Sequence, residues 1–211
     1  IPFYVQLESA DVWSNPDIFR LGRDMTPVAV AGVPPDIFSE DGQLWGNPIY
    51  DWDFQKTNDY AWWRSRLIHN SKLYDVIRID HFRAFADYYT IPYGSKTAKC
   101  GKWEKGVGMP FWNIMNKYVD ADIIAEDLGG NTPEVEKLIK ETGFPNMKVL
   151  QFAFDSDLNN PFLPKNYDKN CVCYTGTHDN DTTGGWFLKL SQKEKNMFSH
   201  IVPADESGSP I

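Results

Sequence analysis

Three carboxylates stand in equivalent places in the sequence, each following a short run of residues typical of a buried strand. They are Asp80, Glu126 and Asp179. The carboxyl ends of parallel strands meet at one mouth of a barrel or one edge of an open sheet, so we expect the three side chains to converge. Like charges raise one another's pKa, and such a cluster is tolerated where the acids bind a hard cation or divide catalytic roles between them.

Divided catalytic roles fit the neighbouring residues better than a cation site does. Glycosyl transfer needs an ionised carboxylate to attack the anomeric carbon and a protonated acid to protonate the leaving oxygen. Strand residues two apart share a face, so Arg78 is expected beside Asp80, where its charge keeps that carboxylate ionised. Glu126 has no such cationic partner in the pattern and can stay protonated. The alternative to a catalytic role for Arg78 and Asp80 is a structural ion pair that closes the strand end. The pattern does not decide which acid of two neighbouring pairs is the catalytic one: Glu126 or Asp127 in the first pair, and Asp179 or Asp181 in the second.

The elements that must position these acids alternate along the chain. Strands are predicted around residues 4, 79, 125, 150 and 174, mostly with helical patterns between them, which is typical of a parallel sheet. Five strands cannot close an eight-stranded barrel, and no G-x-G-x-x-G loop supports an open doubly wound sheet. The chain begins inside its first predicted strand, without Met, so we expect an internal fragment. The predicted fold class is α/β, part of a (β/α)8 TIM-type barrel with about five of its strands.

Four helices have clear signals. Apolar spacing predicts helices over residues 57–74 and 111–118. Thr132 is a predicted N-cap for a helix that runs to Gly143. Ser191, with a glutamate three residues later, forms a capping box for the last helix.

Two stretches, about 8–56 and 84–109, are predicted as long loop insertions in a single partial catalytic barrel that covers residues 1–211. Within the first, residues 27–54 hold so much proline and glycine that a continuous helix or central strand is not expected. Long loops often act as lids or binding loops. Aromatic side chains here either stack on a ligand or pin the loop to the surface: Phe38, Trp45, Tyr50 and Trp52.

The composition excludes several classes of partner. A net charge of −8 argues against nucleic acid and anionic membranes, and no apolar run approaches the length of a membrane span. Aromatic residues make up 15%, with eight Trp, which suits stacking on the flat faces of sugars. The cysteines (Cys100, Cys171 and Cys173) show no metal-ligand spacing with the histidines, so we expect free thiols in the cytoplasm and no structural metal.

Seven segments together resemble one family of enzymes. They are SADVW (9–13), VAGVPPD (30–36), GQLWGNP (42–48), RIDHF (78–82), AEDLG (125–129), KVLQFAF (148–154) and YTGTHDNDT (174–182). The chain resembles the 4-alpha-glucanotransferases called amylomaltase or disproportionating enzyme, relatives of the alpha-amylase superfamily of retaining barrel enzymes. The resemblance covers nearly the whole chain, and the loop carrying the second and third segments separates this family from ordinary amylases.

The resemblance implies a role for each candidate residue. Asp80 would be the nucleophile that forms a covalent glucosyl-enzyme, Glu126 the general acid/base, and Asp179 the residue that stabilises the transition state by binding sugar hydroxyls. Arg78 and His178 would hold the nucleophile and the sugar. The loop over the acceptor side would contain Gln43, Trp45 and Phe38.

The resemblance also implies a reaction. The enzyme would transfer a segment of a 1,4-alpha-glucan, such as a malto-oligosaccharide, to the 4-hydroxyl of another glucan by a retaining double displacement, without a cofactor or metal. A loop that excludes water would let the covalent intermediate survive until the acceptor arrives. The family's Asp directly before the first strand and several further strands are absent, and Ile37 stands where relatives often have Tyr, so we do not expect full activity from these 211 residues alone. The alternatives are an alpha-glucan hydrolase and a non-catalytic glucan-binding module.

Overall fold

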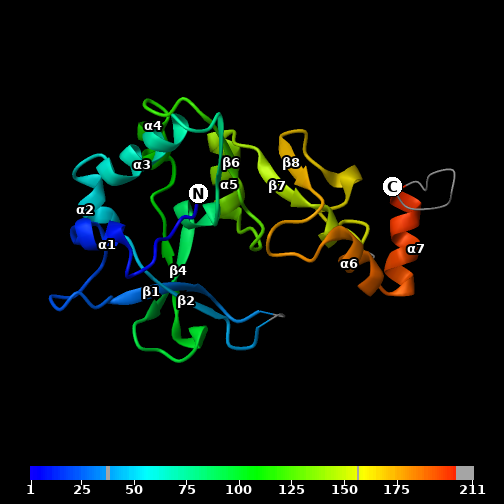
Figure 1. Ribbon diagram of the computed structural model, residues 1–211, viewed down its shortest axis with the longest axis horizontal. Helices are drawn as coiled ribbons and strands as arrows, with labels where there is room; N and C mark the ends of the chain where they lie inside the picture. The colour runs from blue at the N-terminus through cyan, green and yellow to red at the C-terminus, as the bar shows by residue number, and fades with distance from the viewer. Residues whose placement is uncertain (37–38, 156, 203–211) are drawn as a thin grey trace. The chain divides into compact units, whose positions relative to one another are not determined.

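The computed structural model describes residues 1–36, 39–155 and 157–202. The chain divides into two compact units, Ile1–Phe144 and Pro145–Ile211, whose elements are labelled in Figure 1. Within the described ranges, no helix combines the length and the apolar character that crossing a membrane requires.

Two parallel strands form the centre of the first unit's α/β part. Strand β3 (Val76–Ile79) pairs in parallel with β6 (Asp122–Ala125), and Ile79 lies opposite Ala125 in the register. Ile77, Ile79 and Ala125 are buried, as expected for strands covered by helices. Both predicted strands and their parallel direction are confirmed.

The first six residues do not form the predicted strand. Only Ile1 bonds to β3: its nitrogen donates to the carbonyl of Arg78, and its carbonyl accepts from the N–H of Asp80 (2.9 Å). The pairing stops there because the next carbonyl on that side, of Phe3, instead accepts a hydrogen bond from the hydroxyl of Tyr50 (2.8 Å). This part of the prediction is wrong.

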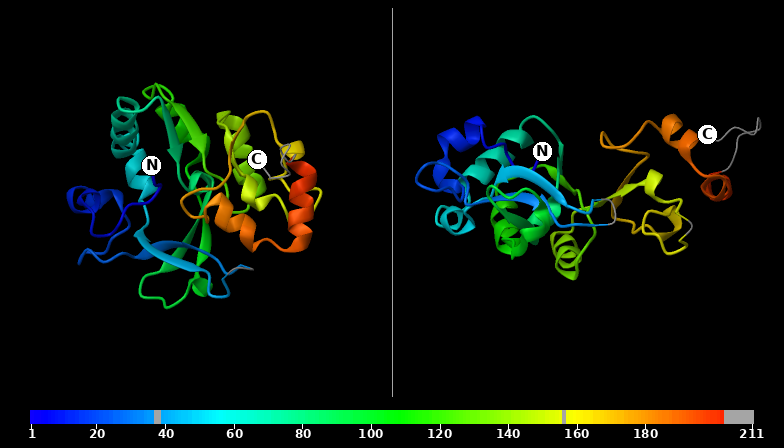
Figure 2. Two further views of the ribbon diagram at one scale, coloured as in Figure 1. Left: turned by 45° about the vertical axis from the view of Figure 1, so that its right-hand side comes forward. Right: turned by 90° about the horizontal axis from the view of Figure 1, so that it is seen from below.

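The two predicted insertions meet in one antiparallel sheet, which lies at one end of the first unit, with helix α3 toward the other end (Figures 1 and 2). The strand order is β2-β1-β4-β5. The prediction that residues 27–54 hold no central strand is therefore wrong, because β1 pairs on both sides. The strands are β1 (Ala29–Val33), β2 (Gln43–Pro48), β4 (Asp87–Pro92) and β5 (Lys102–Lys105).

Proline and glycine occupy positions in this sheet where they do not block pairing. Pro34 and Pro35 follow the end of β1, and Pro48 ends the edge strand β2. Gly32 lies inside β1, where a Cβ would stand 2.1 Å from the carbonyl oxygen of Gln43, so the approach of β2 requires glycine. The proline and glycine content alone thus gave a misleading expectation.

Helices cover the parallel pair. Thr132 caps α5 by accepting from the N–H of Val135 (3.4 Å), and Gly143 ends it in the left-handed conformation (φ 71°), as predicted. The other two predicted helices of this unit are also present, with shifted ends. The α-helices of this unit are α1 (Ala10–Ser14), α2 (Trp52–Lys56), α3 (Ala61–Ser71), α4 (Gly108–Met115) and α5 (Pro133–Thr142).

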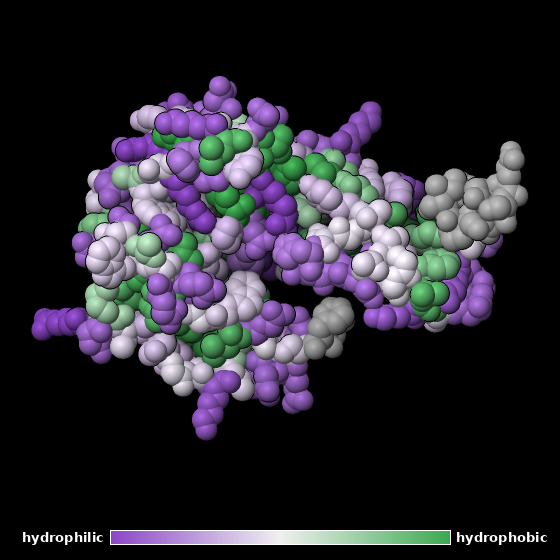
Figure 3. All heavy atoms as spheres, viewed as in Figure 1, coloured by the Kyte–Doolittle hydropathy of each residue, from purple (hydrophilic) through white to green (hydrophobic). Residues whose placement is uncertain are grey.

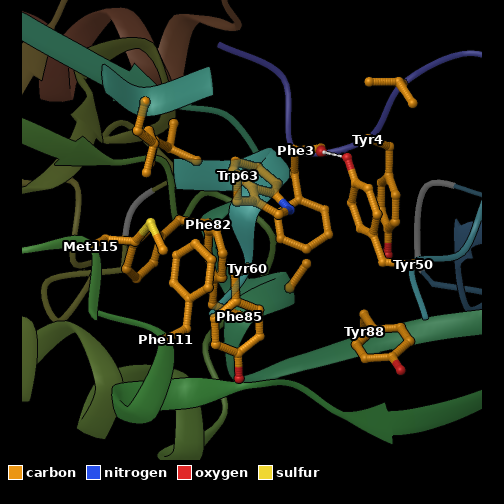
Figure 4. Packing of buried hydrophobic residues seen from close by; sticks show 14 of the residues in the cluster. Phe3, Tyr4, Tyr50, Tyr60, Trp63, Phe82, Phe85, Tyr88, Phe111 and Met115 are labelled. Carbon is orange, nitrogen blue, oxygen red and sulfur yellow. Dashed lines mark hydrogen bonds between the residues drawn. The ribbon is translucent and has the colours of Figure 1, made fainter. Parts of the chain in front are cut away.

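An aromatic core joins these elements, and Figure 4 shows part of it. Trp63 of α3 and Phe111 of α4 are fully buried and meet edge to face, with ring centroids 5.9 Å apart. Phe85 belongs to the short turn after β3, and its ring centroid lies 4.8 Å from that of Phe3 and 4.8 Å from that of Phe111. Tyr50, predicted as a possible ligand-stacking residue, is 1% exposed and belongs to this core instead.

The second unit has its own parallel pair and its own core. Strand β7 (Asn146–Val149) pairs in parallel with β8 (Cys171–Tyr174), as predicted, although β7 ends early in a short 3-10 turn. Helices α6 (Thr183–Lys189) and α7 (Gln192–Ile201) follow, and the predicted capping box at Ser191 is present. The buried residues of its hydrophobic cluster are Ala153, Phe154, Leu163 and Phe198.

Hydrophilic side chains project over much of the face shown in Figure 3, and hydrophobic ones appear there in small patches. The cysteines are Cys100, Cys171 and Cys173, and all three are free thiols, as predicted.

Candidate active site

The end of β3 places a cation beside a carboxylate. A nitrogen of the Arg78 guanidinium lies 3.0 Å from Oδ1 of Asp80. The two side chains are 26% and 44% exposed, so the pair stands at the rim of the strand end rather than inside the core. The predicted pairing of these two residues on one face is confirmed.

Glu126 lies directly beside this pair. It follows Ala125 as Asp80 follows Ile79, on neighbouring strands in register, so the two acids lie side by side at the carboxyl end. Parallel strands are about 4.8 Å apart, which sets the spacing of the two backbones. The Glu126 carboxylate accepts backbone hydrogen bonds from His81 (2.6 Å) and Leu128 (2.8 Å).

A left-handed backbone at His81 makes the first of these bonds possible. In a regular parallel ladder the carbonyl of Glu126 would accept from the N–H of residue 81. His81 has φ 53°, and that carbonyl accepts from Phe82 instead (2.9 Å). The N–H of His81 is thereby released from the ladder and donates to the carboxylate of Glu126.

The environment distinguishes the two acids. Burial raises the pKa of Glu126, and the negative charge of Asp80 adds to the effect, while the two backbone donors and Arg78 oppose it. Asp80 has the Arg78 guanidinium in contact. The site therefore holds one carboxyl group whose pKa is raised by burial beside one that is paired with a cation.

Residues of the first insertion reach this site through His81. The indole of Trp45, on β2, meets the imidazole of His81 edge to face, with centroids 4.8 Å apart. The Trp45 indole N–H donates to the side chain of Gln43 (3.0 Å), which is exposed. The structure thus places Trp45 against the residue that follows Asp80, with Gln43 bonded to Trp45, while their assignment to the acceptor side stays a prediction. Phe38 lies outside the described residues.

Asp179 and His178 lie in the second unit, on the loop after β8. Nε2 of His178 is 3.5 Å from Oδ2 of Asp179, and both side chains are about three-quarters exposed. Asn180 closes the loop by accepting from the N–H of Thr177 (2.8 Å). The convergence of Asp179 with Asp80 and Glu126 stays a prediction.

Local contacts separate the acids that the sequence pattern left equivalent. Asp127 is 8% exposed and accepts from the side chain of Asn131 (2.8 Å), so it braces its own loop. Asp181 lies 2.6 Å from the ammonium of Lys189 and accepts from the N–H of Thr182, which supports the start of α6. Both residues therefore have structural partners within their own segments.

Sequence reasoning missed His81 as a member of the site. The strand ends at Ile79, and after the left-handed backbone of His81 its imidazole packs against Tyr4 and Trp45. Burial and the nearby charge of Arg83 lower the pKa of His81 to about 4. The available signal was a polar residue directly after a strand-end carboxylate, where ladders often break.

Among the residues that the structure describes, no group of three or more His, Cys, Asp or Glu side chains is placed to hold a metal ion.

Comparison with known proteins identifies the family. The family model described as 4-alpha-glucanotransferase matches residues 1–209. The 4-alpha-glucanotransferase of Clostridium butyricum is 54% identical over 197 residues, which are 92% of this chain and 40% of that protein. The chloroplastic/amyloplastic 4-alpha-glucanotransferase of Solanum tuberosum is 49% identical over 208 residues, 98% of this chain and 36% of that protein.

A solved structure has the same fold. The amylomaltase from Streptococcus agalactiae, in complex with acarbose, superposes with a TM-score of 0.90 at 43% identity, covering 95% of this chain and 41% of that one. The predicted fold class, part of a TIM-type barrel, is thereby confirmed. The chain spans about 40% of the length of the curated relatives it matches. By sequence and by fold, the chain belongs to the 4-alpha-glucanotransferase family.

Proposed function

We propose that the complete protein carrying this chain is a retaining 4-alpha-glucanotransferase. It transfers a segment of a 1,4-alpha-glucan to the 4-hydroxyl of an acceptor glucose or glucan. The observation that carries the proposal is the placement of a cation-paired carboxylate, Asp80, beside a carboxyl group of raised pKa, Glu126, on adjacent parallel strands. Membership of the family supports the same activity.

The proposed roles follow from these environments. Asp80, paired with Arg78, attacks the anomeric carbon, and Glu126 protonates the leaving oxygen and later deprotonates the acceptor hydroxyl. Retention requires the two carboxyl groups to stand roughly 5–5.5 Å apart. Neighbouring strands about 4.8 Å apart, with the acids in register, support that spacing.

The remaining candidates act on the sugar. We assign transition-state stabilisation to Asp179 and sugar binding to His178, through hydroxyl groups of the glucose ring. Gln43, Trp45 and Phe38 form the acceptor side. Trp45, packed against His81 and bonded to Gln43, presents an aromatic surface next to the nucleophile, which supports stacking on a sugar and exclusion of water. We propose that acarbose, seen with the S. agalactiae relative, also binds here.

Incubation of the complete protein with maltotriose tests the activity. Transfer produces a ladder of longer and shorter oligosaccharides, whereas hydrolysis produces only shorter products and new reducing ends. A binding module without activity leaves maltotriose unchanged. A chelator in the assay separates carboxylate catalysis, which we expect to be unaffected, from a metal site.

Asp80→Asn is expected to lower transfer by at least about 1,000-fold, the scale seen when a covalent nucleophile is removed. Asp75→Asn is the matched control, because Asp75 is an exposed acid directly before the same strand. A wild-type rate of transfer by the Asp80→Asn protein would contradict both the assignment of Asp80 as the nucleophile and the proposed mechanism.

Glu126→Gln and Asp127→Asn form a second pair on one loop. We expect the first to lose transfer and the second to keep it, since Asp127 is bonded to Asn131 within the loop. The opposite result would exchange the two assignments. Product analysis by chromatography measures both.

We also propose that the protein works in the cytoplasm. Three free thiols support a reducing compartment. Cell fractionation with detection of the protein tests this directly.

A further inference from the structure

The guanidinium of Arg83 joins the two loops that follow the catalytic strands. Arg83 lies three residues after Asp80, in a 3-10 turn (Phe82–Phe85), and is 6% exposed. One of its terminal nitrogens donates to the carbonyl of Gly129 (2.7 Å) and to that of Gly130 (2.9 Å). Both glycines belong to the loop that begins with Glu126.

The rest of the guanidinium is fixed to the antiparallel sheet. Its Nε and second terminal nitrogen both donate to Oδ1 of Asp87, at 3.1 and 2.7 Å, and the ring of Trp103 faces it at 4.3 Å. The other oxygen of Asp87 accepts from the hydroxyl of Thr132, the N-cap of α5 (2.9 Å). The loop from Glu126 to α5 is thus held at its middle and at its end by one buried ion pair.

We propose that Arg83 is a positioning residue that holds the Glu126 loop in the geometry required for acid/base catalysis. The inference rests on the proposed function, because it assigns a supporting residue to the same two acids. Arg83 does not itself touch the sugar. It acts by fixing the backbone on which Glu126 stands.

Lysine cannot replace this contact pattern. The planar guanidinium bonds two carbonyls through one terminal nitrogen and one carboxylate oxygen through its other two nitrogens, whereas an ammonium is a single compact donor. Gly129 and Gly130 have no side chains to restrain them, and Gly130 is in the left-handed region (φ 67°), so their carbonyls depend on an external donor. A shift of about 1 Å in a catalytic group can cost about 100-fold in rate.

The experiment compares Arg83→Lys with wild type in the complete protein, using maltotriose. We expect kcat to fall about 10- to 100-fold with KM changed less than about twofold, because the loss is in positioning the acid rather than in binding. We also expect the basic limb of the kcat/KM profile to move to lower pH, since a loosened loop admits water to Glu126. The charged groups that face Glu126, Asp80 and Arg78, are unchanged in the variant.

Arg20→Lys is the matched control. Arg20 pairs with Glu104 at 2.8 Å in the same unit but has no contact with the Glu126 loop among the described hydrogen bonds and ion pairs. We expect its kcat and pH profile to match those of wild type. An Arg83→Lys protein with a lower melting temperature but a wild-type kcat and pH profile would make Arg83 merely structural and overturn the proposal.

Asp87→Asn decides the question if Arg83→Lys does not fold. It keeps the carbonyl contacts of Arg83 but weakens the anchor, so we expect a smaller fall in kcat with the same direction of the pH shift; an unchanged profile would contradict the proposal. If wild type only hydrolyses maltotriose, the proposed transferase function fails. The role of Arg83 is still decided, by the same comparison on the hydrolysis rate, because both reactions need the acid.

Discussion

At the scale of single residues, the site gives two chemically similar side chains different surroundings. Asp80 stands at a rim beside Arg78, and Glu126 is partly buried with two backbone donors. Burial raises the pKa of Glu126, whereas Asp80 lies in contact with the guanidinium of Arg78. Two carboxylates that follow adjacent strands at the same distance from the strand ends thus lie in different environments, as the proposed acid and nucleophile roles require.

His81 gives a pH prediction for stability. Its pKa is lowered to about 4 in the folded protein, against about 6.5 when unfolded, so the unfolded state takes the proton first as the pH falls. The stabilisation is present above pH 6.5 and is lost as the pH falls toward 4, by at most about 3 kcal/mol. Asparagine tolerates the left-handed backbone at this position. The His81→Asn protein is therefore expected to lose less stability than wild type as the pH falls from 7 to 4.

Thermal melting between pH 7 and pH 4 measures the effect. His69→Asn serves as the control, because His69 is exposed on α3 and should leave the acid sensitivity as in wild type. Equal acid sensitivity in wild type and His81→Asn would mean that the imidazole of His81 takes up its proton at the same pH in the folded and the unfolded protein. That result would contradict its packing against Tyr4 and Trp45.

At the scale of elements, the antiparallel sheet brings the first insertion to the parallel strands. Trp45 reaches His81 from β2, and β2 is positioned by its pairing with β1. That pairing depends on Gly32, where β2 approaches the β1 backbone too closely for any side chain. A single backbone contact in this sheet therefore affects the placement of a proposed sugar-binding residue.

Gly32→Ala is expected to lower the free energy of unfolding by at least about 2 kcal/mol, because its Cβ would stand 2.1 Å from the Gln43 carbonyl oxygen and 2.5 Å from Ile91. Gly184→Ala is the matched control: it lies in α6 with open space around its Cβ position, and alanine there should add up to about 1 kcal/mol. Denaturant unfolding of both proteins gives the values. Equal stabilities would mean that β2 does not approach β1 this closely.

Much of the α/β part could be predicted from the sequence, since β3, β6, β7 and β8 are apolar runs followed by abrupt polarity. The antiparallel sheet could not, because β2 and β4 each end in proline and β1 pairs with a strand far away in the sequence, as Val30 does with Ile91. Asp80 and Glu126 were found because they follow strands. Arg83 was not, since its importance comes from carbonyls of a distant loop.

At the scale of the whole molecule, the chain holds part of a barrel. It spans about 40% of the length of its curated relatives, and its fold follows that of an amylomaltase over nearly its full length. The two parallel pairs, one in each unit, end in the loops that carry the proposed catalytic acids. Assembly of Asp179 with the other two acids is therefore a property that we expect of the complete protein.

The covalent intermediate is the most direct test of the central claim, that Asp80 is the nucleophile and Glu126 the acid/base. The complete protein with Glu126→Gln is incubated with an α-maltotriosyl fluoride blocked at its non-reducing 4-hydroxyl. Fluoride leaves without acid assistance, while the second step lacks its base and its acceptor. Peptide mass spectrometry should find a maltotriosyl group on the peptide that contains Asp80, at its side chain. An adduct on another residue, or release of fluoride with no adduct at any time, would contradict the account.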